Sequence, residues 1–187
     1  MTQEPWPPPH YKRWTIVDYA QRAGIDTLVE TGTYDGDTVG YACQFLRDVY
    51  SIELGRELYE RCRLRFAGCP NVHLLQGDSA VVLPCLLHGL SRPAVLWLDA
   101  HWSDWPGGAK GPLDSAIQGE LSAVAAWGRE DAVVLIDDVR DLGKDGYLPI
   151  GEVRERLLSA YPGWVFYVQD DIARAHRPMG GEGGRKP

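Results

Sequence analysis

The chain has 187 residues and a formal net charge of −7, with 44% hydrophobic and 24% charged residues. This length fits one domain whose core is large enough to be stable without disulfides. The acidic balance argues against sequence-independent binding to nucleic acid or anionic lipid, because both need a basic patch. The apolar runs are too short to span a bilayer and the first residues lack a signal-peptide core, so we expect no membrane partner.

The two ends of the chain differ in composition from the middle. Residues 1–13 form a proline-rich N-terminal extension, which either lies over the domain, contacts a partner subunit or is disordered. Residues 179–187 have the composition of a disordered tail, which leaves a single domain over residues 14–178. The four cysteines form no C-x-x-C pair, so we expect reduced, mostly buried thiols and a cytoplasmic protein.

Hydrophobic periodicity predicts helices and strands that alternate along the domain. A first helix covers residues 14–23 and stops at Gly24. Strands follow at 27–30, 49–53, 72–75, 94–99, 132–137, 164–169 and 172–176, and further helices at 38–46, 56–66, 79–89, 116–127 and 150–160. Asp170 and Asp171 form a tight turn between the last two strands. The pattern predicts an α/β fold: a mostly parallel seven-stranded sheet with a C-terminal β-hairpin and helices on both faces.

The first strand runs into an acidic turn with two glycines, ETGTYDGDT, at residues 30–38. In an open α/β sheet, a nucleotide-like cofactor sits at this first strand-to-helix turn. Glycine lets the backbone approach such a ligand closely. The carboxylates of Glu30, Asp35 and Asp37 would repel a pyrophosphate but suit a ligand that carries positive charge, such as S-adenosylmethionine.

Polar residues also follow the next strands, where the carboxyl ends of parallel strands meet. Glu53 ends the second strand, about twenty residues after the turn, and can accept both hydroxyls of a ribose. Asp78 and Ser79 follow the third strand, and Asp78 can accept from an adenine amino group. Asp99 ends the fourth strand. Each residue also has a structural alternative, because acids at strand ends are often solvated and Asp78 or Ser79 can cap the next helix.

These motifs resemble those of class I S-adenosylmethionine-dependent methyltransferases, and in particular of small, stand-alone bacterial members. The resemblance runs from about residue 14 to residue 176 and rests on ETGTYDGDT at 30–38, SIEL at 51–54, GDS at 77–79, WLDAH at 97–101 and LIDD at 135–138. It implies a Rossmann-like methyltransferase fold and an EC 2.1.1 type of enzyme that uses S-adenosylmethionine. The motifs say little about the substrate.

The resemblance also assigns a role to each residue of the cofactor site. It implies that Glu30 and Thr38 bind the amino and carboxyl groups of the methionine part, and that Gly32, Tyr34 and Gly36 line the turn.

By the same resemblance, Glu53 holds the ribose, and Asp78 and Ser79 face the adenine.

A second cluster is expected on the chemistry side of the site. If the fourth and fifth strands are neighbours, Asp99 lies close to Asp137 and Asp138, and three carboxylates without a cation in the same motifs would repel one another. Mg²⁺ would relieve this repulsion through oxygen ligands. The arrangement resembles the metal-dependent O-methyltransferases, which implies that Asp99, Asp137 and Asp138 bind a metal. The alternatives are a metal-free Asp99 and an Asp137–Asp138 pair that only forms a turn.

Some of those relatives place a lysine base just after the first aspartate, but no lysine occurs here between Asp99 and Lys110. His101 lies two residues after Asp99, so in an extended segment both project to the same side. Histidine titrates near neutrality, and His101 is therefore our candidate base, with Asp99 as the other catalytic residue. The alternative is a structural histidine.

Residues 102–114 form a long loop that contains Trp102 and Trp105, and it either gates the substrate or covers the rim of the sheet. No cap domain is visible, so we expect a methyl acceptor that is either small or held partly by a second subunit in a homodimer. The leading function is O-methylation of a small molecule. A non-catalytic S-adenosylmethionine-binding scaffold or sensor is the alternative, and an NAD-dependent oxidoreductase is disfavoured because G-x-G-x-x-G is absent.

Overall fold

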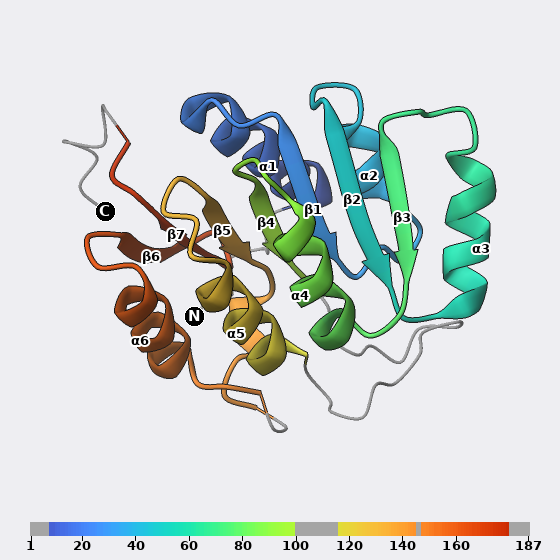
Figure 1. Cartoon of the computed structure of the whole chain (residues 1–187). Helices are drawn as coiled ribbons and strands as arrows, with labels where there is room; N and C mark the ends of the chain where they lie inside the picture. Colours follow the sequence, from blue (N-terminus) through green and yellow to red (C-terminus); the bar gives the residue numbers. More distant parts are fainter. Residues whose placement is uncertain (1–7, 100–115, 145–146, 180–187) are drawn as a thin grey trace.

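The computed structural model describes residues 8–99, 116–144 and 147–179, and Figure 1 shows the arrangement of their helices and strands. Seven strands form one sheet: β1 (Thr27–Thr31), β2 (Asp48–Glu53), β3 (Val72–Gln76), β4 (Val95–Leu98), β5 (Val133–Ile136), β6 (Val165–Gln169) and β7 (Ile172–His176). The helices are α1 (Pro9–Ala23), α2 (Asp37–Ala42), α3 (Arg56–Arg65), α4 (Ser79–Gly89), α5 (Ile117–Trp127), α6 (Ile150–Ala160) and the short 3-10 helix η1 (Val139–Asp141).

The strand order is β3-β2-β1-β4-β5-β7-β6. The first five strands are parallel, and β7 runs antiparallel to both of its neighbours, β5 and β6. A two-residue turn, Asp170 and Asp171, joins β6 to β7, and both residues have the positive φ of a type I′ turn. The predicted mostly parallel sheet with a C-terminal hairpin is confirmed. The order reverses between β1 and β4, and this reversal is where ligands bind in such sheets.

Two apolar clusters hold the helices against opposite faces of the sheet. One cluster joins α4, α5 and α6 to alternate residues such as Leu96 and Leu98 of β4. The other joins α1, α2 and α3 to Val95 and Trp97, the residues of β4 that alternate with Leu96 and Leu98. Because successive side chains of a strand point to opposite faces, the apolar run of β4 serves both layers, as its sequence predicted.

Helix α1 begins at Pro9, five residues earlier than predicted. Proline is tolerated in the first turn of a helix, because the backbone N–H groups there form no hydrogen bond within the helix. The proline-rich lead therefore does not prevent helix formation. Residues 9–13 of the predicted extension are therefore helical. This shift matters because the first turns of α1 carry Tyr11, Lys12 and Arg13, whose side chains bind acidic residues outside the helix.

All four cysteines are free, as predicted, although only Cys62 is buried and Cys85 is exposed. No helix within the described ranges has both the length and the hydropathy that crossing a membrane requires. Of the predicted tail at 179–187, Met179 packs against the apolar cluster of α1, and residues 180–187 lie outside the described residues.

Candidate functional site

The turn between β1 and α2 has a backbone that few residues can adopt. Gly32, Tyr34 and Gly36 all have positive φ, at 84°, 50° and 79°. A Cβ at Gly36 would lie 2.6 Å from the ring of Phe66, so a larger side chain there would be strained by the positive φ and would have to displace this ring. The predicted glycine turn is thus present, and it lies at the carboxyl edge of β1 beside the point where the strand order reverses.

Glu30 is the buried acid of this turn, with 1% of its surface exposed. The hydroxyl of Ser51 donates to its Oε2 at 2.5 Å, and the hydroxyl of Thr33 lies 2.6 Å from that of Ser51. Burial, together with the nearby carboxylates of Asp99 and Glu53, raises the pKa of Glu30 to about 8. A carboxyl group in this state binds a cation well, because a positive ligand stabilises its ionised form.

The predicted neighbour of Glu30 is in place. The side chain of Thr38 lies within hydrogen-bonding reach of Glu30 and lowers its pKa, in opposition to burial. The structure therefore brings together the two residues that the sequence assigned to the amino-acid part of the cofactor.

Glu53 ties the turn to the end of β2. Its Oε2 accepts from the backbone N–H of Tyr34 at 2.8 Å, and its Oε1 accepts from that of Gly55 at 2.7 Å. These two bonds fix the orientation of the carboxylate. Each oxygen keeps a lone pair for a further donor, so Glu53 can still accept hydroxyl groups such as those of a ribose.

Asp78 caps helix α4, because its Oδ1 accepts from the N–H of Ala80 at 2.9 Å. Ser79 is the first residue of α4 and is buried. The capping alternative therefore describes Asp78 in this structure, and adenine contact remains a prediction for Asp78 and Ser79.

The three predicted aspartates do converge. Ligand atoms of Asp99, Asp137 and Asp138 lie within 4.8 Å of one another. The parallel pairing of β4 and β5 brings them together, since each strand ends one residue before its first acid. Burial, followed by repulsion from Asp99 and Asp138, raises the pKa of Asp137 to about 7.

The ammonium group of Lys12, which the sequence motifs did not reveal, contacts two of these aspartates. The Nζ atom of Lys12, from the first turn of α1, is 2.6 Å from Asp137 Oδ1 and 2.7 Å from Asp138 Oδ1. Arg140 also reaches the cluster, with its Nη1 2.8 Å from Asp138 Oδ1. Burial disfavours the charge of Lys12, but the two aspartates outweigh this effect and raise its pKa, so Lys12 stays protonated.

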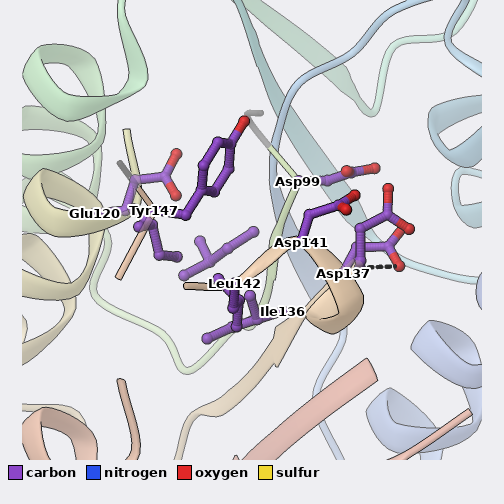
Figure 2. A pocket seen from close by; sticks show the side chains of 10 residues that line it. Asp99, Glu120, Ile136, Asp137, Asp141, Leu142 and Tyr147 are labelled. Atoms are coloured by element: carbon purple, nitrogen blue, oxygen red, sulfur yellow. Dashed lines mark hydrogen bonds between the residues drawn. The ribbon is translucent and has the colours of Figure 1, made fainter. Parts of the chain in front are cut away.

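The aspartate cluster forms one wall of a small pocket. The pocket is lined by the acids Asp99, Glu120, Asp137, Asp138 and Asp141, by Tyr147, and by the apolar side chains Leu98, Ile117, Ile136 and Leu142 (Figure 2). Its lining includes the last residues of β4 and β5, Leu98 and Ile136, and the acids that follow them. Our candidate base His101 and the loop 102–114 lie outside the described residues.

Glu120 was missed by the sequence analysis. It is 1% exposed, and its Oε1 has no hydrogen-bond partner within the part of the chain that the structure describes. Burial raises its pKa to about 7, against the hydrogen bonds of Ser79 and Thr31. A signal for this burial exists in the sequence, because Glu120 is three residues after Ile117 and four before Val124, on the apolar face of α5.

The order and directions of the strands are those of the class I S-adenosylmethionine-dependent methyltransferase fold, and the chain has this fold. No protein-family model matches the sequence.

Comparison with solved structures gives the same result. The chain superposes on the SAH-bound methyltransferase PaMTH1 of Podospora anserina with a TM-score of 0.63 and 14% identity, covering 92% of this chain and 80% of that one. It is equally similar to TomG from Streptomyces achromogenes, an O-methyltransferase involved in Tomaymycin synthesis that was solved in complex with SAM (TM-score 0.63, 16% identity, 92% and 82% covered).

One group of curated proteins shares a short stretch of sequence. A protein-L-isoaspartate O-methyltransferase from Burkholderia mallei (strain SAVP1) is 42% identical over 62 residues, which cover 32% of this chain. The match spans only 19% of the length of that relative.

Proposed function

We propose that this protein transfers a methyl group from S-adenosylmethionine to an oxygen of a small molecule. The observation that carries the proposal is Glu30: a buried carboxyl group with a pKa of about 8, beside a turn in which Gly32 and Gly36 have positive φ. Holding an acid in this state destabilises the empty protein, and a cationic ligand offsets that cost.

The residues fit each part of this cofactor. Glu30 and Thr38 would hold the amino-acid part, and Glu53, whose carboxylate is already oriented by two backbone bonds, would accept the ribose hydroxyls. When bound, the cofactor supplies a methyl group already activated by the sulfonium. The carbon–sulfur bond breaks as a carbon–oxygen bond forms, and sulfur keeps the electron pair.

The acceptor would lie in the pocket beside the aspartate cluster. Apolar side chains on one wall can pack against a carbon skeleton, and the acids and Tyr147 can bind its hydroxyl groups. The hydroxyl that is methylated must lose a proton, and His101, supported by Asp99, is the proposed acceptor of that proton. Comparing the pH–rate profiles of wild type and His101→Ala tests this role: the acid limb should flatten, and an unaltered profile would assign the proton to another group.

A divalent metal is the second candidate component, favoured by the convergence of Asp99, Asp137 and Asp138. As folded, however, the cluster does not fit a metal, because the ammonium of Lys12 lies on two of the three carboxylates. We therefore assign no step of the reaction to it.

Calorimetry with S-adenosylhomocysteine tests the cofactor, with NADH as the comparison ligand. We expect S-adenosylhomocysteine to bind and NADH not to bind. Absence of heat with folded protein, or binding of NADH alone, would refute the proposal. Binding without methyl transfer to any acceptor in a broad panel of hydroxylated small molecules would instead favour the scaffold or sensor alternative.

A further inference from the structure

The first turn of α1 places a positive charge inside the aspartate cluster. We propose that the ammonium of Lys12 is a resident cation of Asp137 and Asp138, beside the guanidinium of Arg140 at Asp138, and that it excludes a divalent metal from the site. The proposal concerns the acceptor half of the site and so rests on the proposed function for its meaning, although the cation site itself can be tested without turnover.

Distances make the ammonium and a metal mutually exclusive. A hard divalent cation binds carboxylate oxygens at about 2.0–2.6 Å. The Nζ atom of Lys12 lies 2.6 and 2.7 Å from one oxygen each of Asp137 and Asp138. A metal bound to the same two oxygens would therefore occupy nearly the position of the ammonium, and the two positive charges would repel each other.

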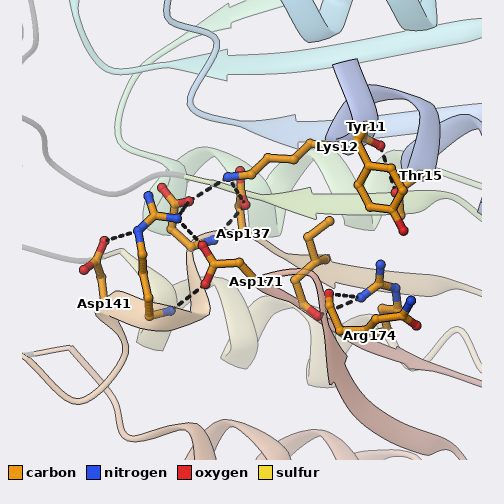
Figure 3. A network of polar contacts seen from close by, with 11 residues as sticks. Tyr11, Lys12, Thr15, Asp137, Asp141, Asp171 and Arg174 are labelled. Carbon is orange, nitrogen blue, oxygen red and sulfur yellow. Dashed lines mark hydrogen bonds and ion pairs between the residues drawn. The ribbon is translucent and has the colours of Figure 1, made fainter. Parts of the chain in front are cut away.

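The surroundings hold Lys12 in this position. On one side, the hydroxyl of Tyr11 donates to Asp170 Oδ2 at 2.6 Å; on the other, Arg13 Nη1 lies 3.2 Å from Asp37 Oδ2. Figure 3 shows Lys12 reaching from α1 toward Asp137, with Tyr11 beside it. The first turn of α1 is thus fastened to the β6–β7 turn and to the start of α2, so Lys12 is part of the site and not a mobile surface lysine.

The body of α1 is also anchored. Ile16, Tyr19 and Ala20 of this helix belong to the apolar cluster on its face of the sheet. The side chain of Lys12 is only 18% exposed. Moving the ammonium away to admit a metal would require loss of both ion pairs, and moving the helix would require loss of core packing as well.

Removal of the charge should convert the cluster into a metal site. Lys12→Met removes the ammonium but keeps the length of the apolar stem. We expect Mn²⁺, followed by the paramagnetic resonance signal of the free ion, to bind this variant at least tenfold more tightly than wild type. Adding Asp137→Asn should abolish the gain. Arg22→Met is the matched control, because Arg22 forms an ion pair with Asp18 at the far end of the same helix, and it should bind Mn²⁺ like wild type.

A folded Lys12→Met variant that binds Mn²⁺ no more tightly than wild type would overturn the proposal. Acetylation of the wild type, read by mass spectrometry, tests it without a variant. Lys12 should react at least tenfold more slowly than the exposed Lys144, with or without millimolar Mn²⁺. Acceleration at Lys12 by Mn²⁺ would mean that metal displaces the ammonium, which refutes the proposal.

The two proposals fail in different experiments. Loss of S-adenosylhomocysteine binding would refute the proposed function and leave the cation result standing. A protein that binds the cofactor but carries Mn²⁺ at the aspartates in its wild-type form would keep the function and refute the role of Lys12.

Discussion

Replacing Glu30 with glutamine should make the empty protein more stable and less able to bind its cofactor. The amide keeps the shape of the side chain and its hydrogen bond with Ser51, but it cannot ionise. In wild type the folded state holds this carboxyl group with a pKa of about 8, against an ordinary value of 4.5. Folding must therefore keep the group neutral at a pH where the unfolded chain would ionise it.

The size and sign of the effect follow from this difference. At pH 7 the pH is about 2.5 units above the ordinary pKa of 4.5 that the group has in the unfolded chain, and each unit corresponds to about 1.4 kcal/mol. The unfolding free energy of wild type should therefore be about 3 kcal/mol lower than that of Glu30→Gln. A raised folded pKa means that the penalty is absent below about pH 4.5. It grows as pH rises and reaches its full size of about 5 kcal/mol above the folded pKa of about 8.

Urea unfolding at pH 5, 6, 7 and 8 measures this profile. The difference in unfolding free energy between Glu30→Gln and wild type should be below about 1 kcal/mol at pH 5 and increase steadily to pH 8. Glu57→Gln, at an exposed position of α3, is the control and should show no such slope. A difference that does not change with pH would refute the claim that Glu30 is held neutral.

The same group should make cofactor binding depend on pH. If the ligand ammonium binds the ionised form of Glu30, affinity for S-adenosylhomocysteine should increase up to tenfold per pH unit between pH 6 and 8 and then level off. Calorimetry checks this, and Glu30→Gln should bind weakly without that dependence. Equal affinity of variant and wild type would remove Glu30 from the ligand site.

Three further predictions concern the turn and the packing. Glu53→Ala should weaken S-adenosylhomocysteine binding at least tenfold, about 1.4 kcal/mol by calorimetry, and unchanged affinity would remove Glu53 from the ribose. Gly36→Ala should destabilise the fold by about 1–3 kcal/mol in urea, because the added Cβ meets Phe66 and φ is positive; a neutral change would show that the turn relaxes. Tyr161→Phe should cost about 1 kcal/mol in the same assay, because the hydroxyl donates to the carbonyl of Val124, and no loss would mean that water replaces this bond.

Most of the fold could be predicted because its signals are local. Apolar runs such as residues 94–99 and 132–137 indicate buried parallel strands, and the Asp170–Asp171 pair indicates the final hairpin. The carboxyl ends of such strands meet at one edge, so the convergence of Asp99 with Asp137 was also accessible to sequence reasoning. These predictions need only the period of each segment and the rules of sheet connection.

The parts that were missed depend on contacts between distant segments. Lys12 lies 126 residues before its partner Asp138, and nothing in the neighbouring sequence indicates that the first turn of α1 lies at the aspartates. The start of α1 was placed too late because Pro8 and Pro9 were taken for an extended lead. Glu120 was passed over because an acid in a helix is usually solvated, although its spacing from Ile117 puts it on the apolar face.

The position of β7 has a consequence for synthesis of the chain. Strand β5, which consists of four apolar residues, pairs on one side with β4 and on the other with residues 172–176. A ribosome delivers those residues some forty positions after β5. Until they emerge, β5 is an exposed apolar edge strand with unpaired backbone groups. Nascent chains can then pair with one another through this edge or be bound by chaperones.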